Sequence, residues 1–210
     1  MKIFKFGGAS VKDAEGVKNV LHVLKTVGHE DVLIVISAMG KTTNALELVI
    51  KNYFDKSKEL HASLQEVRKY HNQIVLDLFD DEEHEVFFDV NAHFDDLEYF
   101  VRSNKSPNYP FVYDQIISIG EMVSTTIVSH YLNAAGITNQ WLDVRHYIKT
   151  DANYRDANVN WEYTQKLIQL GMPSFMNPAT FLQDLASIAS LSSVTIQDVF
   201  PVAEAIYLRN

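Results

Sequence analysis

The chain begins with a short apolar strand that runs directly into a pair of glycines and then into a helix. Within the segment Met1-Lys-Ile-Phe-Lys-Phe-Gly-Gly-Ala-Ser-Val11, Lys5 lies just before Gly7 and Gly8. Glycine has no Cβ, so the backbone N–H groups of such a turn can approach an anion closely, and the positive end of the following helix favours negative charge there. The pattern therefore predicts a phosphate site with Lys5 as its charged side chain. The alternative is an ordinary strand-to-helix turn that uses glycine for backbone reasons alone.

Composition and charge narrow the class of protein. The chain has 210 residues, enough for one large domain or two small ones, and its 47% of hydrophobic residues support a globular protein. A formal net charge of -9, without a cluster of Lys and Arg, argues against nucleic acid or an anionic membrane as the main partner. The absence of cysteine excludes disulfides and fits a reducing compartment. Because the sequence shows neither a signal peptide nor a membrane-spanning run, we expect a cytoplasmic protein.

The first 44 residues predict a strand, a helix, a second strand and a loop. Apolar residues recur at helical spacing over 13–27, and Gly28 follows where a helix end is expected. The run Val32–Ile36 has no polar alternation, which is typical of a strand buried on both faces. This order predicts a βαβ unit with two parallel strands. The loop at 37–44 then lies at the carboxyl end of a strand, where open α/β sheets bind ligands.

The middle of the chain is predicted to be helical. We expect a helical insertion over about 45–102, a loop at 104–110, a long helix from 112 or 113 to 136, and a third buried strand at 139–144. The acidic run at 80–85, followed by Asp89, Asp95, Asp96 and Glu98, could indicate a metal or acid/base site, but a solvated helix face explains it more simply. The eight histidines include no H-E-x-x-H or i, i+4 pair, so we predict no metal site.

The string K-F-G-G-A-S-V at the N-terminus resembles the signature of aspartokinases, K-F-G-G-[ST]-S-[VL], with Ala9 in place of Thr or Ser. Three later segments resemble aspartokinase motifs in the same order and at similar spacing. They are V-I-S-A-M-G-K-T-T-N at 35–44, I-S-I-G-E-M-V-S-T at 117–125 and Q-W-L-D-V-R at 140–145. Each segment taken alone has a simpler explanation. Thr43 could cap a helix, Glu121 could be a buried glutamate that pairs with another side chain for structural reasons, and Arg145 could be a surface residue. Together the four segments extend the resemblance over residues 1–167.

The resemblance also implies roles for individual residues. The phosphates of ATP would be bound by Lys5, which is also the catalytic residue, together with Gly7, Gly8 and Ser10. The substrate L-aspartate would meet the hydroxyls of Ser37 and Thr43, and Glu121 would face its α-ammonium group. The attacking carboxylate is already ionised at pH 7 and requires no general base. Such a transfer needs positioning and charge neutralisation, which Lys5, the backbone N–H groups of the glycine turn and Mg²⁺ on the nucleotide would supply.

For the whole chain, the resemblance implies a three-layer α/β sandwich of the amino-acid-kinase type with a mostly parallel sheet, truncated on the nucleotide-binding side. Residues 1–167 would be the amino-acid-binding part of the domain, and 168–210 a tail of unknown assignment. After Leu167 the family would continue with a Gly-Arg-Gly-Gly-Ser-Asp-type loop, which carries a catalytic Asp, and then an ATP-binding half-sheet. Instead the sequence predicts a loop at 171–180, a helix near 181–191 and a short strand at 194–196.

The implied activity is ATP-dependent phosphorylation of the aspartate side chain, the first step towards lysine, threonine and methionine. Two alternatives stay open: a catalytically silent module that binds an amino acid or a partner subunit, and another kinase of the same fold. We expect a chain of this length to have little activity alone. We also expect a homo-oligomer or a complementing subunit, because a sheet of three or four strands presents an apolar edge that a partner would cover.

Overall fold

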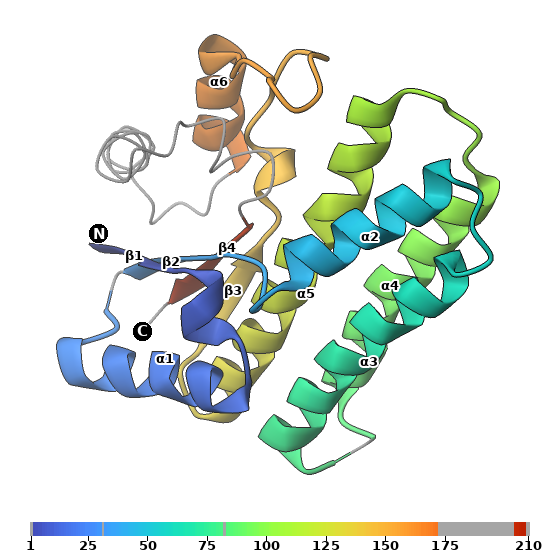
Figure 1. Ribbon diagram of the computed structural model, residues 1–210. Helices are drawn as coiled ribbons and strands as arrows, with labels where there is room; N and C mark the ends of the chain where they lie inside the picture. Colours follow the sequence, from blue (N-terminus) through green and yellow to red (C-terminus); the bar gives the residue numbers. More distant parts are fainter. Residues whose placement is uncertain (1, 31, 82, 172–203, 209–210) are drawn as a thin grey trace.

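The computed structural model describes residues 2–30, 32–81, 83–171 and 204–208 (Figure 1). Its sheet has four strands in the order β1 (Lys2–Phe6), β2 (Val32–Ile36), β4 (Glu204–Leu208) and β3 (Asn139–Leu142). β1 and β2 are parallel, whereas β4 is antiparallel to both β2 and β3. β1, β2 and β3 therefore run in one direction, and the predicted, mostly parallel sheet is confirmed with one reversed strand inside it.

The predicted βαβ unit is also confirmed. A short 3₁₀ turn, η1 (Gly8–Val11), leads from β1 into α1 (Ala14–Val27). The carboxylate of Asp13 accepts a hydrogen bond of 2.8 Å from the Gly16 N–H and so caps the helix. Gly28 ends α1 with φ +87°, a conformation that glycine adopts without strain. Every residue of β2 is buried, as the run without polar alternation predicted.

The helical insertion consists of α2 (Thr42–Phe54), α3 (Leu60–Phe79) and α4 (Glu85–Ser103). These helices pack against α5 (Tyr109–Ala134), which also contacts β2, β3 and β4 and so links the helical group to the sheet (Figure 1). The shared core consists of fully buried apolar side chains, among them Leu46, Val75, Phe94, Ile116 and Ile127. No helix within the described parts of the chain has the length and apolar character needed to cross a membrane.

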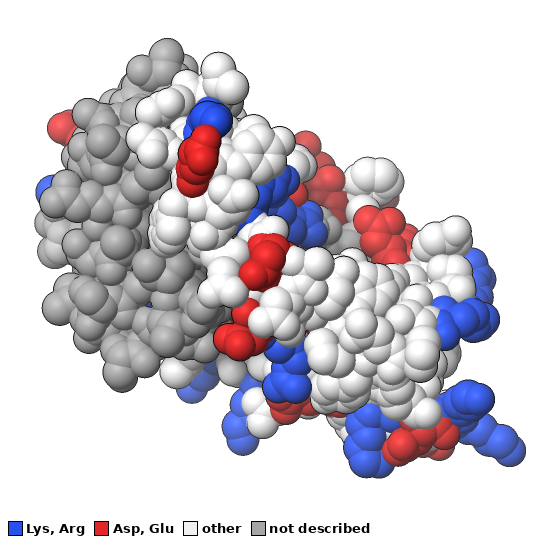
Figure 2. All heavy atoms as spheres, turned by 90° about the horizontal axis from the view of Figure 1, so that it is seen from above, with Lys and Arg blue, Asp and Glu red and all other residues white. Residues whose placement is uncertain are grey.

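Figure 1 shows α1 on one side of the sheet and α6 (Trp161–Gly171) on the other, consistent with the predicted three-layer α/β arrangement. The preceding connection contains a second 3₁₀ turn, η2 (Val144–His146), and is joined to α6 by a 3.0 Å hydrogen bond from the Lys149 N–H to Thr164 Oγ1. Seen from above in Figure 2, the described surface carries Lys and Arg side chains interspersed with Asp and Glu.

Two boundaries and one strand differ from the prediction. α5 begins at Tyr109 rather than at 112 or 113, because Asn108 caps it and Pro110 occupies the first turn, where proline fits a helix. The third strand ends at Leu142, two residues before the predicted end at 144. β4 was not predicted as a strand, and the structures predicted for 171–180, 181–191 and 194–196 lie essentially outside the described residues.

Candidate functional site

The glycine turn after β1 lies directly against the loop after β2. A Cβ built on Gly8 would lie 2.4 Å from the carbonyl oxygen of Ala38, a contact that side chains essentially never make. The backbone joins the two segments as well, with hydrogen bonds of 2.9 Å from Gly40 N–H to Gly8 O and 3.1 Å from Ser37 N–H to Phe6 O. Glycine at position 8 is therefore required by this close approach.

The helix α5 meets the same loop through a second glycine. A Cβ on Gly120 would lie 3.0 Å from the Cβ of Ala38 and 3.2 Å from Cγ2 of Thr42. One turn further along, Ser124 Oγ donates a hydrogen bond of 3.0 Å to the carbonyl oxygen of Ser37. Three segments that are far apart in the sequence thus meet around Ala38: the glycine turn, the 37–44 loop and the α5 segment that carries Glu121.

The predicted phosphate-binding residues share one turn. Lys5 is exposed on β1 and pairs with Val35 of β2. Gly7 lies immediately before η1, and a Cβ added to it would meet no atom within 4 Å. The Ser10 N–H donates 2.8 Å to the Gly7 carbonyl, so the turn is closed by its own backbone. Ser10 itself is exposed.

The predicted substrate-binding residues occupy the other two segments. Ser37 and Thr43 are half-buried, in the loop after β2 and in the first turn of α2 respectively. Glu121 is half-buried in α5, and its Oε2 atom has no exposure to solvent. Among the described residues, hydrogen bonds and close backbone approaches join the segments of Gly8, Ser37 and Glu121. The side chains of Lys5 and Thr43 reach no other member of the predicted set.

A buried pair supports the 37–44 loop and was missed by sequence reasoning. Thr42 Oγ1 donates a hydrogen bond of 2.6 Å to the Met39 carbonyl oxygen and lies 3.2 Å from Nε2 of His71 in α3. His71 Nδ1 lies 2.8 Å from the Val67 carbonyl, which places the ring proton on Nδ1. Burial lowers the pKa of His71 to about 4, so the ring is neutral at pH 7. The signal was present, because His71 continues the apolar helical spacing of Val67 and Ile74.

The fourth sequence segment lies one strand further away, since β4 separates β3 from β2. Arg145 donates to the two oxygens of Asp143 at 2.8 and 2.7 Å. Burial would raise the pKa of Asp143, but the hydrogen bonds and charge of Arg145 outweigh it and the pKa is lowered. Asp151, in the following loop, accepts hydrogen bonds from Asn153 and Asn158 within its own turn. The segment reaches the α5 segment through Trp141, whose indole N–H donates a hydrogen bond of 2.9 Å to Thr125 Oγ1.

Comparison with known proteins agrees with the geometry. Residues 1–178 match the model of the amino acid kinase family. The chain is 28% identical over 170 residues to the bifunctional aspartokinase/homoserine dehydrogenase 2 of Escherichia coli, covering 80% of this chain and 21% of that protein. It is 31% identical over 156 residues to aspartokinase 1, chloroplastic, of Arabidopsis thaliana, covering 71% of this chain and 26% of the relative.

Among solved structures, the fold is similar to that of E. coli aspartokinase III in complex with aspartate and ADP. The TM-score is 0.71 at 20% identity, and the match covers 82% of this chain and 37% of that one. A structure of the same enzyme with lysine and aspartate matches with a TM-score of 0.61. The chain therefore spans about a fifth to a quarter of the length of these two curated relatives, and somewhat more than a third of the chains in the solved structures.

Proposed function

Because the chain belongs to the amino acid kinase family, we propose that it takes part in ATP-dependent phosphorylation of the side-chain carboxylate of L-aspartate, giving 4-phospho-L-aspartate. The observation that carries this proposal is the meeting of three segments around Ala38, since these are the segments that resemble aspartokinase motifs. The named relatives are aspartokinases, which supports phosphorylation of a carboxylate as the reaction class. We place the protein in the cytoplasm, within a homo-oligomer or beside a complementing subunit.

In this proposal the glycine turn binds the phosphates of ATP. Transfer of a phosphoryl group to a carboxylate brings two anions together, so the site must neutralise charge at the point of attack. Lys5 supplies a full positive charge at the end of β1, and we assign it the catalytic role. The backbone N–H groups around Gly7 and Gly8, with the Ser10 hydroxyl, supply neutral donors at the same edge of the sheet.

L-aspartate would lie between the 37–44 loop and α5. The hydroxyls of Ser37 and Thr43 can donate to its carboxylates, and Thr43 lies in the first turn of α2, where the helix favours negative charge. Glu121 would take the α-ammonium group. Because its Oε2 atom is buried, the ion pair would form where the effective dielectric is below that of water and the attraction is stronger.

Mg²⁺ would enter the site bound to ATP, as part of the substrate. Within the described parts of the chain, no group of three or more His, Cys, Asp or Glu side chains is arranged to hold a metal ion. A nucleotide-bound Mg²⁺ would supply charge neutralisation at the phosphates. The residues of this chain would bind and orient the two substrates.

Titration calorimetry with L-aspartate tests the proposal. The 210-residue chain should bind L-aspartate, and Glu121→Gln should weaken binding by about 10- to 100-fold, the effect of losing a charged hydrogen bond. Glu59→Gln is the matched control, because Glu59 is an exposed glutamate at the start of α3. Thermal unfolding of each variant would separate loss of binding from loss of fold. No heat with L-aspartate, or equal affinity of the wild type and Glu121→Gln, would contradict the proposal.

A second candidate function is a module that binds an amino acid or a partner subunit without catalysis. It is favoured by the coverage of the relatives, since this chain spans only 21% to 26% of the two named above. Separate titrations distinguish the two: a kinase binds both ATP and L-aspartate, whereas a silent module binds L-aspartate alone. A third reading, another kinase of the same fold, would show tighter binding of a different carboxylate or phosphate acceptor.

A further inference from the structure

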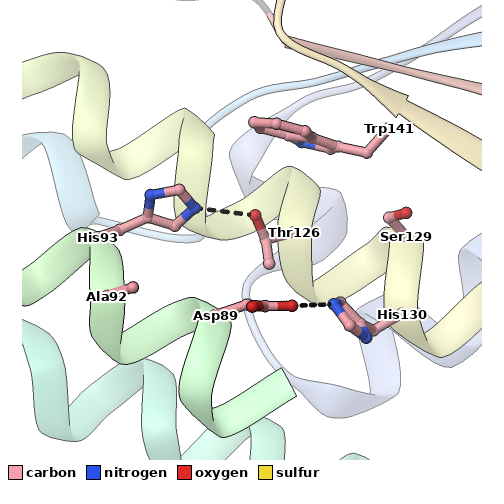
Figure 3. Close-up of a pocket in the computed structure, with 7 residues that line it drawn as sticks. All are labelled: Asp89, Ala92, His93, Thr126, Ser129, His130 and Trp141. Carbon is pink, nitrogen blue, oxygen red and sulfur yellow. Dashed lines mark hydrogen bonds and ion pairs between the residues drawn. The ribbon is translucent and has the colours of Figure 1, made fainter. Parts of the chain in front are cut away.

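A separate cavity lies between α4, α5 and β3, away from the segments that meet at Ala38 (Figure 3). Its volume is about 370 Å³, within the range of small-molecule sites. The side chains that give it chemical character are Asp89, His93, Thr126, Ser129, His130 and Trp141. None of them belongs to the proposed aspartate or ATP site, so the cavity is independent of the proposed function.

Trp141 offers the cavity an aromatic ring rather than a hydrogen-bond donor. Its indole Nε1–H donates 2.9 Å to Thr125 Oγ1, so the donor is already used and the ring orientation is fixed. Figure 3 shows the indole on one side of the cavity and Asp89 with His130 on the other. The ring centre of His93 lies 6.4 Å from that of Trp141. An electron-rich ring therefore lies across the cavity from a carboxylate.

Acidic side chains outnumber basic ones at one end of the cavity. Nε2 of His130 lies 2.9 Å from Oδ2 of Asp89, the one carboxylate among the described lining residues, and its Nδ1 lies 3.6 Å from Oε1 of Glu85, which lies outside the lining. Two carboxylates flank one imidazole, so this group of three side chains keeps a net negative charge even when His130 is protonated.

The other titratable groups near the cavity do not cancel that charge. Burial lowers the pKa of His93, and the positive charge of Arg145 lowers it further. The negative charges of Asp89, Asp96 and Asp143 raise it, but the net shift is downward. His93 is therefore neutral at pH 7. Arg145, in turn, is paired with Asp143 through hydrogen bonds of 2.8 and 2.7 Å.

Most of the donors that an anion would need are already used. Ser129 Oγ donates a hydrogen bond of 2.6 Å to Asn139 Oδ1, and the contact of 3.1 Å between His93 Nε2 and Thr126 Oγ1 uses one of the two protons of that pair. An anionic ligand would meet Asp89 with few donors to compensate, whereas a cation would gain both a carboxylate and a ring face.

We propose that this cavity binds a small organic cation: an ammonium group attached to an apolar or aromatic body. The ammonium group lies beside Asp89, and the body packs against the face of Trp141. Attraction between a cation and an indole face adds to the ion pair, and both interactions strengthen as water leaves the cavity. The ligand class follows from charge and shape, and it covers protonated amines and quaternary ammonium compounds alike.

Tryptophan fluorescence can measure this binding directly. The chain has two tryptophans, and the second, Trp161, is 42% exposed in α6. In a Trp161→Phe chain, Trp141 is the single reporter. Phenethylammonium should change its emission saturably, and phenylacetate, with the same ring and opposite charge, should bind at least about tenfold more weakly, as expected for an ion pair gained or lost. Neutral 2-phenylethanol should fall between them.

Variants in the same background locate the site. Asp89→Asn should weaken phenethylammonium binding about tenfold. Asp96→Asn is the control, because Asp96 is exposed on the same helix and does not line the cavity. Its charge acts on the cavity only through the longer range that it also has to His93, so the affinity should fall by much less than in Asp89→Asn. Ala92→Phe, which fills the cavity from α4, should abolish the saturable change while leaving the unfolding transition in place. Equal affinity for the three probes, or no effect of Asp89→Asn and Ala92→Phe, would overturn the proposal.

Discussion

Thr42 and His71 form a buried pair, with 3.2 Å between Thr42 Oγ1 and His71 Nε2, that joins the first turn of α2 to the middle of α3. Both side chains are almost fully buried, and Thr42 also donates to the Met39 carbonyl in the loop after β2. Through Thr42 and His71, the helix α3 of the insertion is thus connected to the loop after β2, which belongs to the candidate site. We infer that α3 helps to fix the conformation of the 37–44 loop.

The same pair predicts a pH dependence of stability. The pKa of His71 is lowered to about 4 in the fold by burial, whereas an unfolded histidine titrates near 6.5. The unfolded chain therefore takes up this proton first as the pH falls. The contribution of neutral His71 is fully present above about pH 6.5 and is lost as the pH falls to about 4, by about 3 kcal/mol.

Chemical unfolding between pH 4 and 7 tests this contribution. As the pH falls from 7 to 4, the free energy of unfolding should decrease by about 3 kcal/mol less in His71→Gln than in the wild type. His22→Gln, at an exposed histidine of α1, is the control and should keep the wild-type dependence. Parallel curves for His71→Gln and the wild type would show that His71 does not titrate in this range on unfolding.

The two adjacent glycines of the turn should differ in how much stability an alanine substitution costs. Gly8→Ala places a Cβ 2.4 Å from the Ala38 carbonyl, so the backbone must shift, and we expect a loss of about 1–3 kcal/mol in the free energy of unfolding. Gly7→Ala has nothing within 4 Å and a φ of −74°, and should change stability by less than about 1 kcal/mol. Denaturant titration of both variants makes the comparison, and equal effects would contradict the close approach at Gly8.

The local elements near the N-terminus could be predicted from the sequence. α1 is specified by apolar residues at helical spacing, by Asp13 as its cap and by Gly28 at its end, all within one short segment. The start of α5 was placed too late, because Pro110 was interpreted as part of a loop although it is compatible with a first helical turn.

What the sequence could not predict depends on contacts between distant residues. β4 is a short strand whose partner β2 lies about 170 residues earlier, and nothing local to 204–208 specifies that register. The close approach of Gly120 to Ala38 joins two segments that are far apart in the sequence, and nothing local to either segment specifies it. The cavity beside Trp141 was missed because its carboxylate was attributed to a solvated helix face.

The chain alone should have little or no aspartokinase activity. The pattern expected for the catalytic Asp loop and the ATP-binding half does not occur in these 210 residues. Loss of positioning groups from a phosphoryl-transfer site commonly costs several orders of magnitude in rate. An aspartyl-hydroxamate assay checks this, and turnover at the kinase-like rate of about 1–100 per second would refute it.

We also expect the chain to associate in solution. β1 is an edge strand of the sheet, and its side chains Ile3, Phe4 and Phe6 are only half-buried. Such an edge is normally covered by a partner. Sedimentation velocity over a range of concentrations should show reversible association. A compact species whose sedimentation coefficient stays that of a monomer at every concentration would argue against it.

The central claim, that the glycine turn binds phosphate with Lys5 as its charged group, can be tested with inorganic triphosphate. Lys2→Ala is the matched control, because Lys2 is exposed at the opposite end of the same strand, where its Nζ lies 3.4 Å from the Val27 carbonyl.

The decisive measurement is calorimetric titration of triphosphate into the wild type, Lys5→Ala and Lys2→Ala, with the free energy of unfolding of each protein measured alongside. We predict that Lys5→Ala weakens triphosphate binding by about 1–3 kcal/mol, while its stability changes by no more than about 0.5 kcal/mol, as expected for an exposed charged side chain. Lys2→Ala should change neither quantity appreciably. If Lys5→Ala instead unfolds the protein and leaves the triphosphate affinity of the remaining folded fraction unchanged, Lys5 is a structural residue and the glycine turn is only a turn.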